Sequence, residues 1–188
     1  MWRYSGCVAV DNMSSPANIS VLVLDVDGVL TDGTISFDPQ TRIENKTFHV
    51  HDGLGLSLWQ KVGNHVILIS GRNAPCVTQR AAELGIKYVH QGSKDKIADL
   101  CTTLDTLGAT AQQTCFVGDD LGDLAAMDYA GYSVAVHNAV QEVKEAADWI
   151  TSIDGGHGAV REVVEHLMHA AGTWTKAIAT CNEVSLKQ

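Results

Sequence analysis

The chain has 188 residues, 45% of them hydrophobic, and a net charge of −9, so it is long enough for one well-buried domain but short for two. The acidic balance argues against nucleic acid or an anionic membrane as the main partner, since both need a basic face. No apolar run approaches the roughly 20 residues of a membrane span. Five scattered cysteines, odd in number and without the spacing of a metal site, predict reduced thiols in a cytoplasmic protein.

Strand-like and helix-like stretches alternate from residue 19 onward. Buried strands are predicted over 19–25, 65–70, 86–91, 114–118, 132–136 and 149–151. Helices are predicted over 52–62, 74–84, 93–107, 119–130 and 138–147, and in the second part of 155–171. This alternation predicts an α/β fold, a doubly wound parallel sheet of Rossmann-like type with helices on both faces.

Residues 33–50 interrupt the alternation. Two β-rich segments flank the turn sequence DPQT (38–41), which predicts a β-hairpin flap. In the helix that follows the hairpin, we expect Leu54, Leu58 and Trp59 to share one face.

The predicted elements fit a single domain. The division that we expect is an N-terminal extension over 1–18, the domain over 19–171 and a C-terminal tail over 172–188. Ser93 is predicted to cap the helix that ends before Gly108. Apolar residues at helical spacing predict the buried face of the last helix: Val160, Val163, Val164, Leu167 and Met168.

Polar side chains follow the first, second and fourth predicted strands, and the carboxyl ends of parallel strands meet at one edge of the sheet, where ligands bind. The residues are Asp25, Asp27, Ser70, Arg72, Asp119, Asp120 and Asp123, with Lys94 and Lys96 near the start of the helix after the third strand. Two carboxylates one residue apart raise each other's pKa unless a cation compensates. Carboxylates with a serine and a lysine, and without a His/Cys cluster, suit Mg²⁺ rather than Zn²⁺.

Phosphoryl transfer through an aspartyl phosphate needs this set of groups. Asp25 would be the nucleophile, and Asp27 would protonate the leaving alcohol and later activate water. Ser70 and backbone amides would hold phosphate oxygens, and Lys96 would neutralise charge. The predicted metal ligands are Asp25, Asp27 and Asp119, while Asp120 and Asp123 would support the metal or orient Lys96.

Each of these residues also has an ordinary structural interpretation. Asp25 could be a turn residue at the end of a strand, and Ser70 could cap the next helix. Asp120 and Asp123 could be acids favoured at a helix N-terminus. Lys94 is interpreted as a solvated charge. The four clusters together, rather than any one of them, favour the catalytic interpretation.

The motifs resemble those of the haloacid dehalogenase superfamily, in its phosphatase branch. They are DVDGVLTDG (25–33), SGR (70–72), Lys96 and GDDLGD (118–123). A closer resemblance, to the family of 3-deoxy-D-manno-octulosonate 8-phosphate phosphatases, rests on the hairpin and on FHVHDGLG (48–55), HQGSKDK (90–96) and GGHGAVRE (155–162). This resemblance implies a capless, Mg²⁺-dependent homotetramer that serves lipopolysaccharide precursor synthesis, with the hairpins of neighbouring subunits joined to cover the site.

The resemblance also implies which residues contact a sugar-acid phosphate: Thr31, His51, Gly71 and Arg72. The family usually has Arg at the positions of His51 and His157. Histidine grips a carboxylate more weakly than arginine and is only partly charged. Arg72 remains as a candidate partner for the substrate carboxylate.

The sequence leaves alternative functions open. A phosphatase of a nonulosonate 9-phosphate would use the same chemistry. A receiver-type module would need its phosphoacceptor at the end of the third strand, which here ends in Val89 and His90. An inert oligomeric scaffold would not need the full set of catalytic groups.

Overall fold

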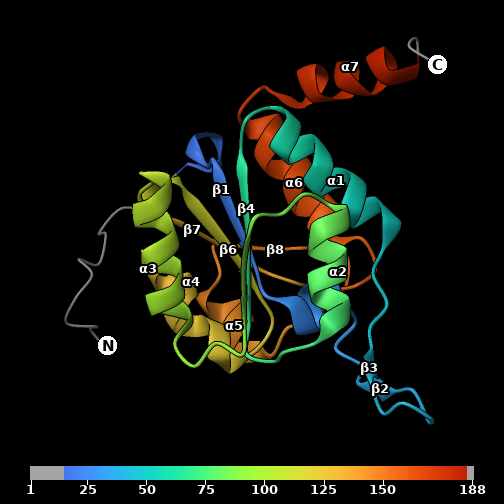
Figure 1. Ribbon diagram of the computed structural model, residues 1–188. Coiled ribbons are helices and arrows are strands. Elements are labelled where there is room, and N and C mark those ends of the chain that lie inside the picture. Colours follow the sequence, from blue (N-terminus) through green and yellow to red (C-terminus); the bar gives the residue numbers. More distant parts are fainter. Residues whose placement is uncertain (1–14, 186–188) are drawn as a thin grey trace.

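The computed structural model describes residues 15–185 and shows a parallel sheet between two layers of helices (Figure 1). The sheet has six strands in the order β5-β4-β1-β6-β7-β8, and every pair of neighbours is parallel. The strands are β1 Val21–Leu24, β4 His65–Ser70, β5 Tyr88–Gln91, β6 Thr114–Gly118, β7 Tyr132–Ala135 and β8 Trp149–Ile150. The predicted doubly wound fold is therefore confirmed.

Helices cover both faces of this sheet. They are α1 Val50–Lys61, α2 Pro75–Glu83, α3 Lys96–Leu107, α4 Leu124–Tyr129, α5 Gln141–Ala146, α6 Ala159–Ala170 and α7 Trp174–Ser185. Figure 1 shows α1, α2 and α6 on one side and α3, α4 and α5 on the other. Short helical turns are η1 Pro16–Asn18, η2 Val26–Leu30, η3 Ala111–Gln113 and η4 Leu121–Asp123. None of the helices within the described part of the chain is long and apolar enough to span a membrane.

The core lies along β1 and the inner faces of α1 and α6. All four residues of β1 are completely buried, as a central parallel strand requires. The predicted buried face of α6 is confirmed at all five positions. On α1 the prediction was wrong for Leu54, which is 46% exposed, while Leu56 is buried beside Leu58 and Trp59. Leu54 lies about 140° from Trp59 around the helix, beyond the face that can reach the sheet.

Two further predictions need correction. Ser93 does not cap α3, because the N-cap is Asp95, whose Oδ1 accepts a hydrogen bond of 3.0 Å from the amide of Ala98. The predicted tail contains a helix, α7. Its Ala177 is completely buried, and the ring of Trp174 lies under the guanidinium of Arg161 at 5.1 Å. The first part of α7 therefore packs on the domain.

The predicted hairpin projects from the body of the domain (Figure 1). Its strands are β2 Ser36–Phe37 and β3 Glu44–Asn45, which pair antiparallel. Asp38 closes the turn, since its Oδ1 accepts hydrogen bonds from the amides of residues 40 and 41. No cap domain is inserted anywhere in residues 15–185.

Candidate active site

The site begins where β1 ends, in the turn η2. Asp25, directly after β1, is still extended, and Gly28 takes φ = 100°, a conformation that other residues rarely adopt. A Cβ atom on Gly28 would overlap Oδ2 of Asp119. Thr31 holds the turn: its hydroxyl donates to the carbonyl of Val26 and accepts from the amide of Gly28. This part of the sequence therefore brings the ends of β1 and β6 into direct contact.

Three carboxylates meet at this edge. Oxygen atoms of Asp25, Asp119 and Asp123 lie within 4.8 Å of one another. Lys96, at the first position of α3, donates to Oδ1 of Asp25 at 2.6 Å and to Oδ1 of Asp123 at 2.7 Å. Asp25 and Asp123 are both buried. One ammonium thus serves two buried carboxylates, and neither of these hydrogen bonds reaches Asp119.

The charge balance is reflected in the pKa values. Burial raises the pKa of Asp25 to about 6, and repulsion from Asp123 adds to this rise while Lys96 opposes it. Burial and repulsion from Asp25 and Asp123 raise the pKa of Asp119 to about 8. Burial alone would lower the pKa of Lys96, but attraction to Asp25 and Asp123 outweighs it and the pKa is raised.

These residues fit a divalent cation. Oδ1 of Asp119 is buried and has no hydrogen-bond partner among the described residues, which is unfavourable unless another ligand meets it. Three oxygen donors without nitrogen or sulfur suit Mg²⁺. Asp123 is the third carboxylate of the cluster, whereas the carboxylate of Asp27 is directed to Lys46 and Ser70. The metal-binding role of Asp27 stays a prediction.

Asp120 and Asp123 have local structural roles as well. Oδ2 of Asp123 accepts hydrogen bonds from the amides of Asp119 at 3.0 Å and Asp120 at 3.4 Å. Asp120 is exposed and caps η4 through the amide of Leu121 at 2.7 Å. The structure thus places Asp123 inside the cluster and Asp120 at its rim.

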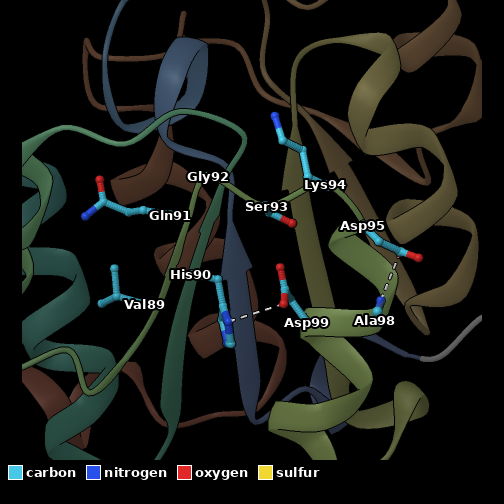
Figure 2. Close-up of a pocket in the computed structure, with 9 residues that line it drawn as sticks. All are labelled: Val89, His90, Gln91, Gly92, Ser93, Lys94, Asp95, Ala98 and Asp99. Carbon is cyan, nitrogen blue, oxygen red and sulfur yellow. Dashed lines mark hydrogen bonds and ion pairs between the residues drawn. The ribbon is translucent and has the colours of Figure 1, made fainter.

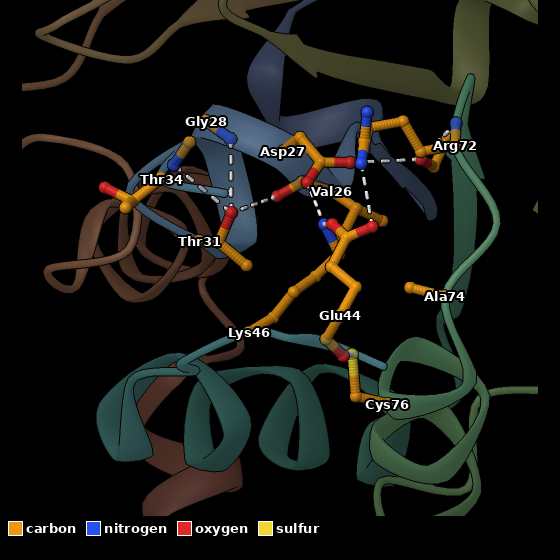
Figure 3. A network of polar contacts seen from close by, with 12 residues as sticks. Val26, Asp27, Gly28, Thr31, Thr34, Glu44, Lys46, Arg72, Ala74 and Cys76 are labelled. Atoms are coloured by element: carbon orange, nitrogen blue, oxygen red, sulfur yellow. Dashed lines mark hydrogen bonds and ion pairs between the residues drawn. The ribbon is translucent and has the colours of Figure 1, made fainter. Parts of the chain in front are cut away.

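Asp27 lies in a second polar group, which Figure 3 shows. Lys46 donates to Oδ1 of Asp27 and, at 2.6 Å, to Glu44. The hydroxyl of Ser70 donates to Oδ2 of Asp27 at 3.3 Å and accepts from the amide of Arg72 at 3.0 Å. Burial would lower the pKa of Lys46, but its hydrogen bonds to Asp27 and Glu44 leave the pKa raised.

Sequence reasoning missed Glu44 and Lys46. The sequence did hold a signal for them. Glu44 and Lys46 are two residues apart in the predicted hairpin, and residues at this spacing on a strand point to the same face. A pair of opposite charges on one face of a flap indicates a charged contact. Nothing local indicated which side chains across the molecule the pair would meet.

The remaining predicted residues lie around this centre. Gly71 and Arg72 form an exposed loop, and the guanidinium of Arg72 donates to Glu44 at 2.7 Å. His51 is exposed in the first turn of α1, with its ring 5.0 Å from that of His49. His157 is exposed, and its Nδ1 lies 2.9 Å from the carbonyl of Gly155. The hydroxyl of Thr31 makes hydrogen bonds within η2, and its contact with substrate stays a prediction.

A pocket of about 460 Å³ lies between the end of β5 and the start of α3 (Figure 2). Its lining includes His90, Ser93 and Lys94 but none of the clustered aspartates. Lys94 therefore belongs to this polar depression, while the ammonium of Lys96 reaches the cluster.

The fold and the carboxylate edge define a class of protein, and sequence comparison agrees with it. The family model of haloacid dehalogenase-like hydrolases matches residues 88–163. A relative from Escherichia coli K12, 3-deoxy-D-manno-octulosonate 8-phosphate phosphatase, is 40% identical over 172 residues, which are 92% of this chain and 91% of the relative. The chain therefore belongs to the 3-deoxy-D-manno-octulosonate 8-phosphate phosphatase family of haloacid dehalogenase-like hydrolases.

Solved structures give the same result. The phosphatase of this name from Moraxella catarrhalis, in complex with magnesium, phosphate and the sugar acid KDO, is 38% identical with a TM-score of 0.85, over 88% of this chain and 95% of that one. A cobalt-bound form of the Haemophilus influenzae phosphatase is 39% identical with a TM-score of 0.81, over 85% and 93% of the two chains.

Proposed function

We propose that this protein is a Mg²⁺-dependent phosphatase that hydrolyses 3-deoxy-D-manno-octulosonate 8-phosphate to the free sugar acid and phosphate. The observation that carries the proposal is the meeting of Asp25, Lys96, Asp119 and Asp123 at the end of β1, with Asp27 beside Ser70. The relatives' names and the magnesium, phosphate and sugar acid bound in the Moraxella catarrhalis structure support the substrate.

The chain's own residues account for the two chemical steps. A carboxylate oxygen of Asp25 attacks phosphorus, a bond forms between them, and the bond from phosphorus to the sugar oxygen breaks as Asp27 gives that oxygen a proton. Water then loses a proton to Asp27 and attacks the aspartyl phosphate, which releases phosphate and restores Asp25. Lys96 offsets charge on Asp25, and Ser70 with the adjacent amides holds phosphate oxygens.

Mg²⁺ would be held by Asp25 and Asp119, with Asp123 or Asp27 completing the protein ligands. When bound, it would supply the positive charge that lets an anionic carboxylate approach an anionic phosphate. The unpartnered oxygen of Asp119 supports this assignment.

The sugar acid would be recognised at the mouth of the site. Arg72 is exposed next to the Asp27 group, where its guanidinium can also reach a substrate carboxylate. We place Thr31, Gly71 and His51 among the substrate contacts. His51 and His157 stand where the family usually has Arg, which favours keeping a nonulosonate 9-phosphate as the alternative substrate.

A phosphate-release assay tests this function. The protein is given both sugar-acid phosphates in Mg²⁺ buffer, with the Asp25→Asn variant and EDTA as controls. We expect faster turnover of the octulosonate ester, none in Asp25→Asn, and recovery after EDTA when Mg²⁺ is restored. Equal rates on the two sugars would remove the proposed specificity, and turnover without metal would contradict the metal assignment.

We also infer that the protein works as a homotetramer. Ile35, Phe37 and Ile43 on the hairpin are each at least 50% exposed, and a lone two-stranded hairpin gains stability by packing against other surfaces. Cytoplasmic localisation stays a prediction that rests on the cysteines, of which Cys76, Cys101 and Cys115 are thiols in the described part of the chain.

A further inference from the structure

Four charged side chains form an unbroken series that runs from the loop after β4, through the flap, to the turn η2 (Figure 3). The guanidinium of Arg72 contacts Glu44 at 2.7 Å, Glu44 contacts the ammonium of Lys46 at 2.6 Å, and Lys46 contacts Asp27. Positive and negative charges alternate along the series. Asp27 is fixed at its other oxygen by the hydroxyl of Ser70 at 3.3 Å.

Lys46 is the most enclosed member of the series. Its side chain is 1% exposed, compared with 10% for Glu44, 20% for Asp27 and 42% for Arg72. Lysine is almost never fully buried unless it is paired, and loss of one partner from a buried pair is far more disruptive than the pair's net contribution suggests. The position of Lys46 is therefore set by Asp27 and Glu44.

The local structure of the flap explains how the lysine arrives there. Glu44 begins β3, and Lys46 comes directly after the strand ends at Asn45. The ammonium of Lys46 lies 2.6 Å from Oε1 of Glu44, so the two side chains lie on the same side of the flap. The carbonyl of Glu44 also accepts from Sγ of Cys76 at 3.7 Å, which holds β3 against the start of α2. The flap is tied to the site within one chain by these contacts.

The catalytic lysine cannot perform this task for Asp27. Lys96 is engaged by Asp25 and Asp123 at 2.6 and 2.7 Å. Each of the two central carboxylates thus has its own ammonium, and they come from different parts of the fold. Lys96 comes from α3 and serves the nucleophile, whereas Lys46 comes from the flap and serves the acid/base residue.

We propose that Lys46 is a positioning residue for proton transfer, which holds the Asp27 carboxylate toward Ser70 and the leaving oxygen and offsets its charge once its proton has gone. Glu44 keeps Lys46 in place. This inference rests on the proposed phosphatase function and extends it, because it makes the flap part of the reaction centre as well as its cover.

The test compares leaving groups. The alcohol of an alkyl phosphate is a poor leaving group unless its oxygen is protonated as the bond to phosphorus breaks. The leaving group of p-nitrophenyl phosphate is a stable phenolate, which needs little general-acid help. The ratio kcat/KM covers steps up to the formation of the aspartyl phosphate, so it isolates protonation of the leaving group. General-acid catalysis contributes about 10²–10⁴-fold, and we expect Lys46→Met to lose about 10- to 100-fold on the sugar-acid phosphate.

The same variant should keep its kcat/KM on p-nitrophenyl phosphate within a few-fold of the original protein. On the sugar-acid phosphate, Lys46→Arg should recover part of the lost kcat/KM. The kcat/KM of Glu44→Gln should lie between that of Lys46→Met and that of the original protein. Lys87→Met, at an exposed lysine outside the site, is the matched control and should behave as the original protein. Thermal unfolding of every variant shows that the fold is retained.

A parallel fall on both substrates, or no fall on either, would overturn the proposal. A crystal structure of Lys46→Met is the second arm, in which the contact of Asp27 with Ser70 should be lost; retention of that contact would also overturn it. If the unaltered protein cleaves p-nitrophenyl phosphate but no sugar-acid phosphate, the proposed substrate is wrong, and the crystal structure alone decides the role of Lys46.

Discussion

Asp25 and Asp119 illustrate how burial prepares a metal site. Their carboxyl groups lie close together and are removed from solvent at one edge of the sheet. Burial and repulsion from neighbouring carboxylates raise the pKa of Asp25 to about 6 and the pKa of Asp119 to about 8. A protonated carboxyl group cannot serve as an anionic ligand. The cation and the protons therefore compete for the same oxygens.

We predict that Mg²⁺ binds more tightly as the pH rises from about 6 to about 8.5. The raised pKa values mean that the metal-free protein still holds protons in this range, and binding must release them. Isothermal titration in buffers of different ionisation enthalpy measures the affinity and the proton release together. Asp119→Asn should lose binding, while Asp105→Asn, at an exposed acid on α3, should retain it. A dissociation constant that does not change with pH would contradict the prediction.

Other residues show where sequence reasoning stopped. Asp25, Ser70 and Asp119 were predicted because each stands at or directly after a strand end in a recognisable motif, and Lys96 was predicted from its spacing after the third strand. Their meeting at one edge follows from the parallel sheet, which the structure has. Lys46 was missed because it follows a two-residue strand whose partners are fixed only by how the hairpin docks.

At the scale of elements, the turn η2 depends on Gly28. Its positive φ and its contact with Asp119 leave no room for a side chain. Gly63, at the end of α1, has the same φ of 100°, but nothing lies within 4 Å of the position that a Cβ atom would take there. Substitution of both glycines by alanine therefore distinguishes the cost of backbone strain, which both variants have, from the cost of steric overlap, which only Gly28→Ala has.

We predict that Gly28→Ala loses Mg²⁺ binding and phosphate release and is destabilised by about 2–4 kcal/mol, since strain of about 1–3 kcal/mol is joined by overlap. Gly63→Ala should cost only about 1 kcal/mol and keep full activity. Urea unfolding and the phosphate-release assay measure both effects. Equal behaviour of the two variants would show that the contact with Asp119 is unimportant.

The helix α7 was not predicted from the spacing of apolar residues in the sequence. Residues 172–188 were expected to form a tail, yet α7 contacts α1 and α6, and its Ala177 is completely buried. By contrast, the strands and the buried face of α6 were predictable, since their apolar patterns are long and regular. The predictions that Leu54 is buried and that Ser93 caps α3 were wrong for local reasons. The first depends on the exact face that a short amphipathic helix buries, and the second on the choice between neighbouring capping residues.

Trp174→Ala should lower the free energy of unfolding by about 1–3 kcal/mol, through lost apolar burial and the lost contact with Arg161. Ile178→Ala, at a 43% exposed position of the same helix, should change it by less than about 0.5 kcal/mol. Urea titration followed by circular dichroism provides the values. Similar losses in both variants would contradict the claim that the packing of Trp174 on Arg161 is what stabilises α7.

At the scale of the whole molecule, the exposed apolar residues of the hairpin carry the proposed assembly. Phe37→Glu should reduce the molar mass measured by analytical ultracentrifugation, because a charge cannot be buried in an apolar interface without a partner. Ile150→Glu, at a 40% exposed position on the edge strand β8, is the control. A monomer before mutation, or an unchanged mass after it, would refute the tetramer.

The central claim is that the protein hydrolyses its substrate through an acyl phosphate formed on the carboxylate of Asp25. Rapid quenching during turnover of 3-deoxy-D-manno-octulosonate 8-phosphate, followed by borohydride reduction, converts an aspartyl phosphate into homoserine, which peptide mass spectrometry locates. The account predicts homoserine at position 25 and none in the Asp25→Asn variant. Turnover without modification at this position, or homoserine at position 27 instead, would contradict it.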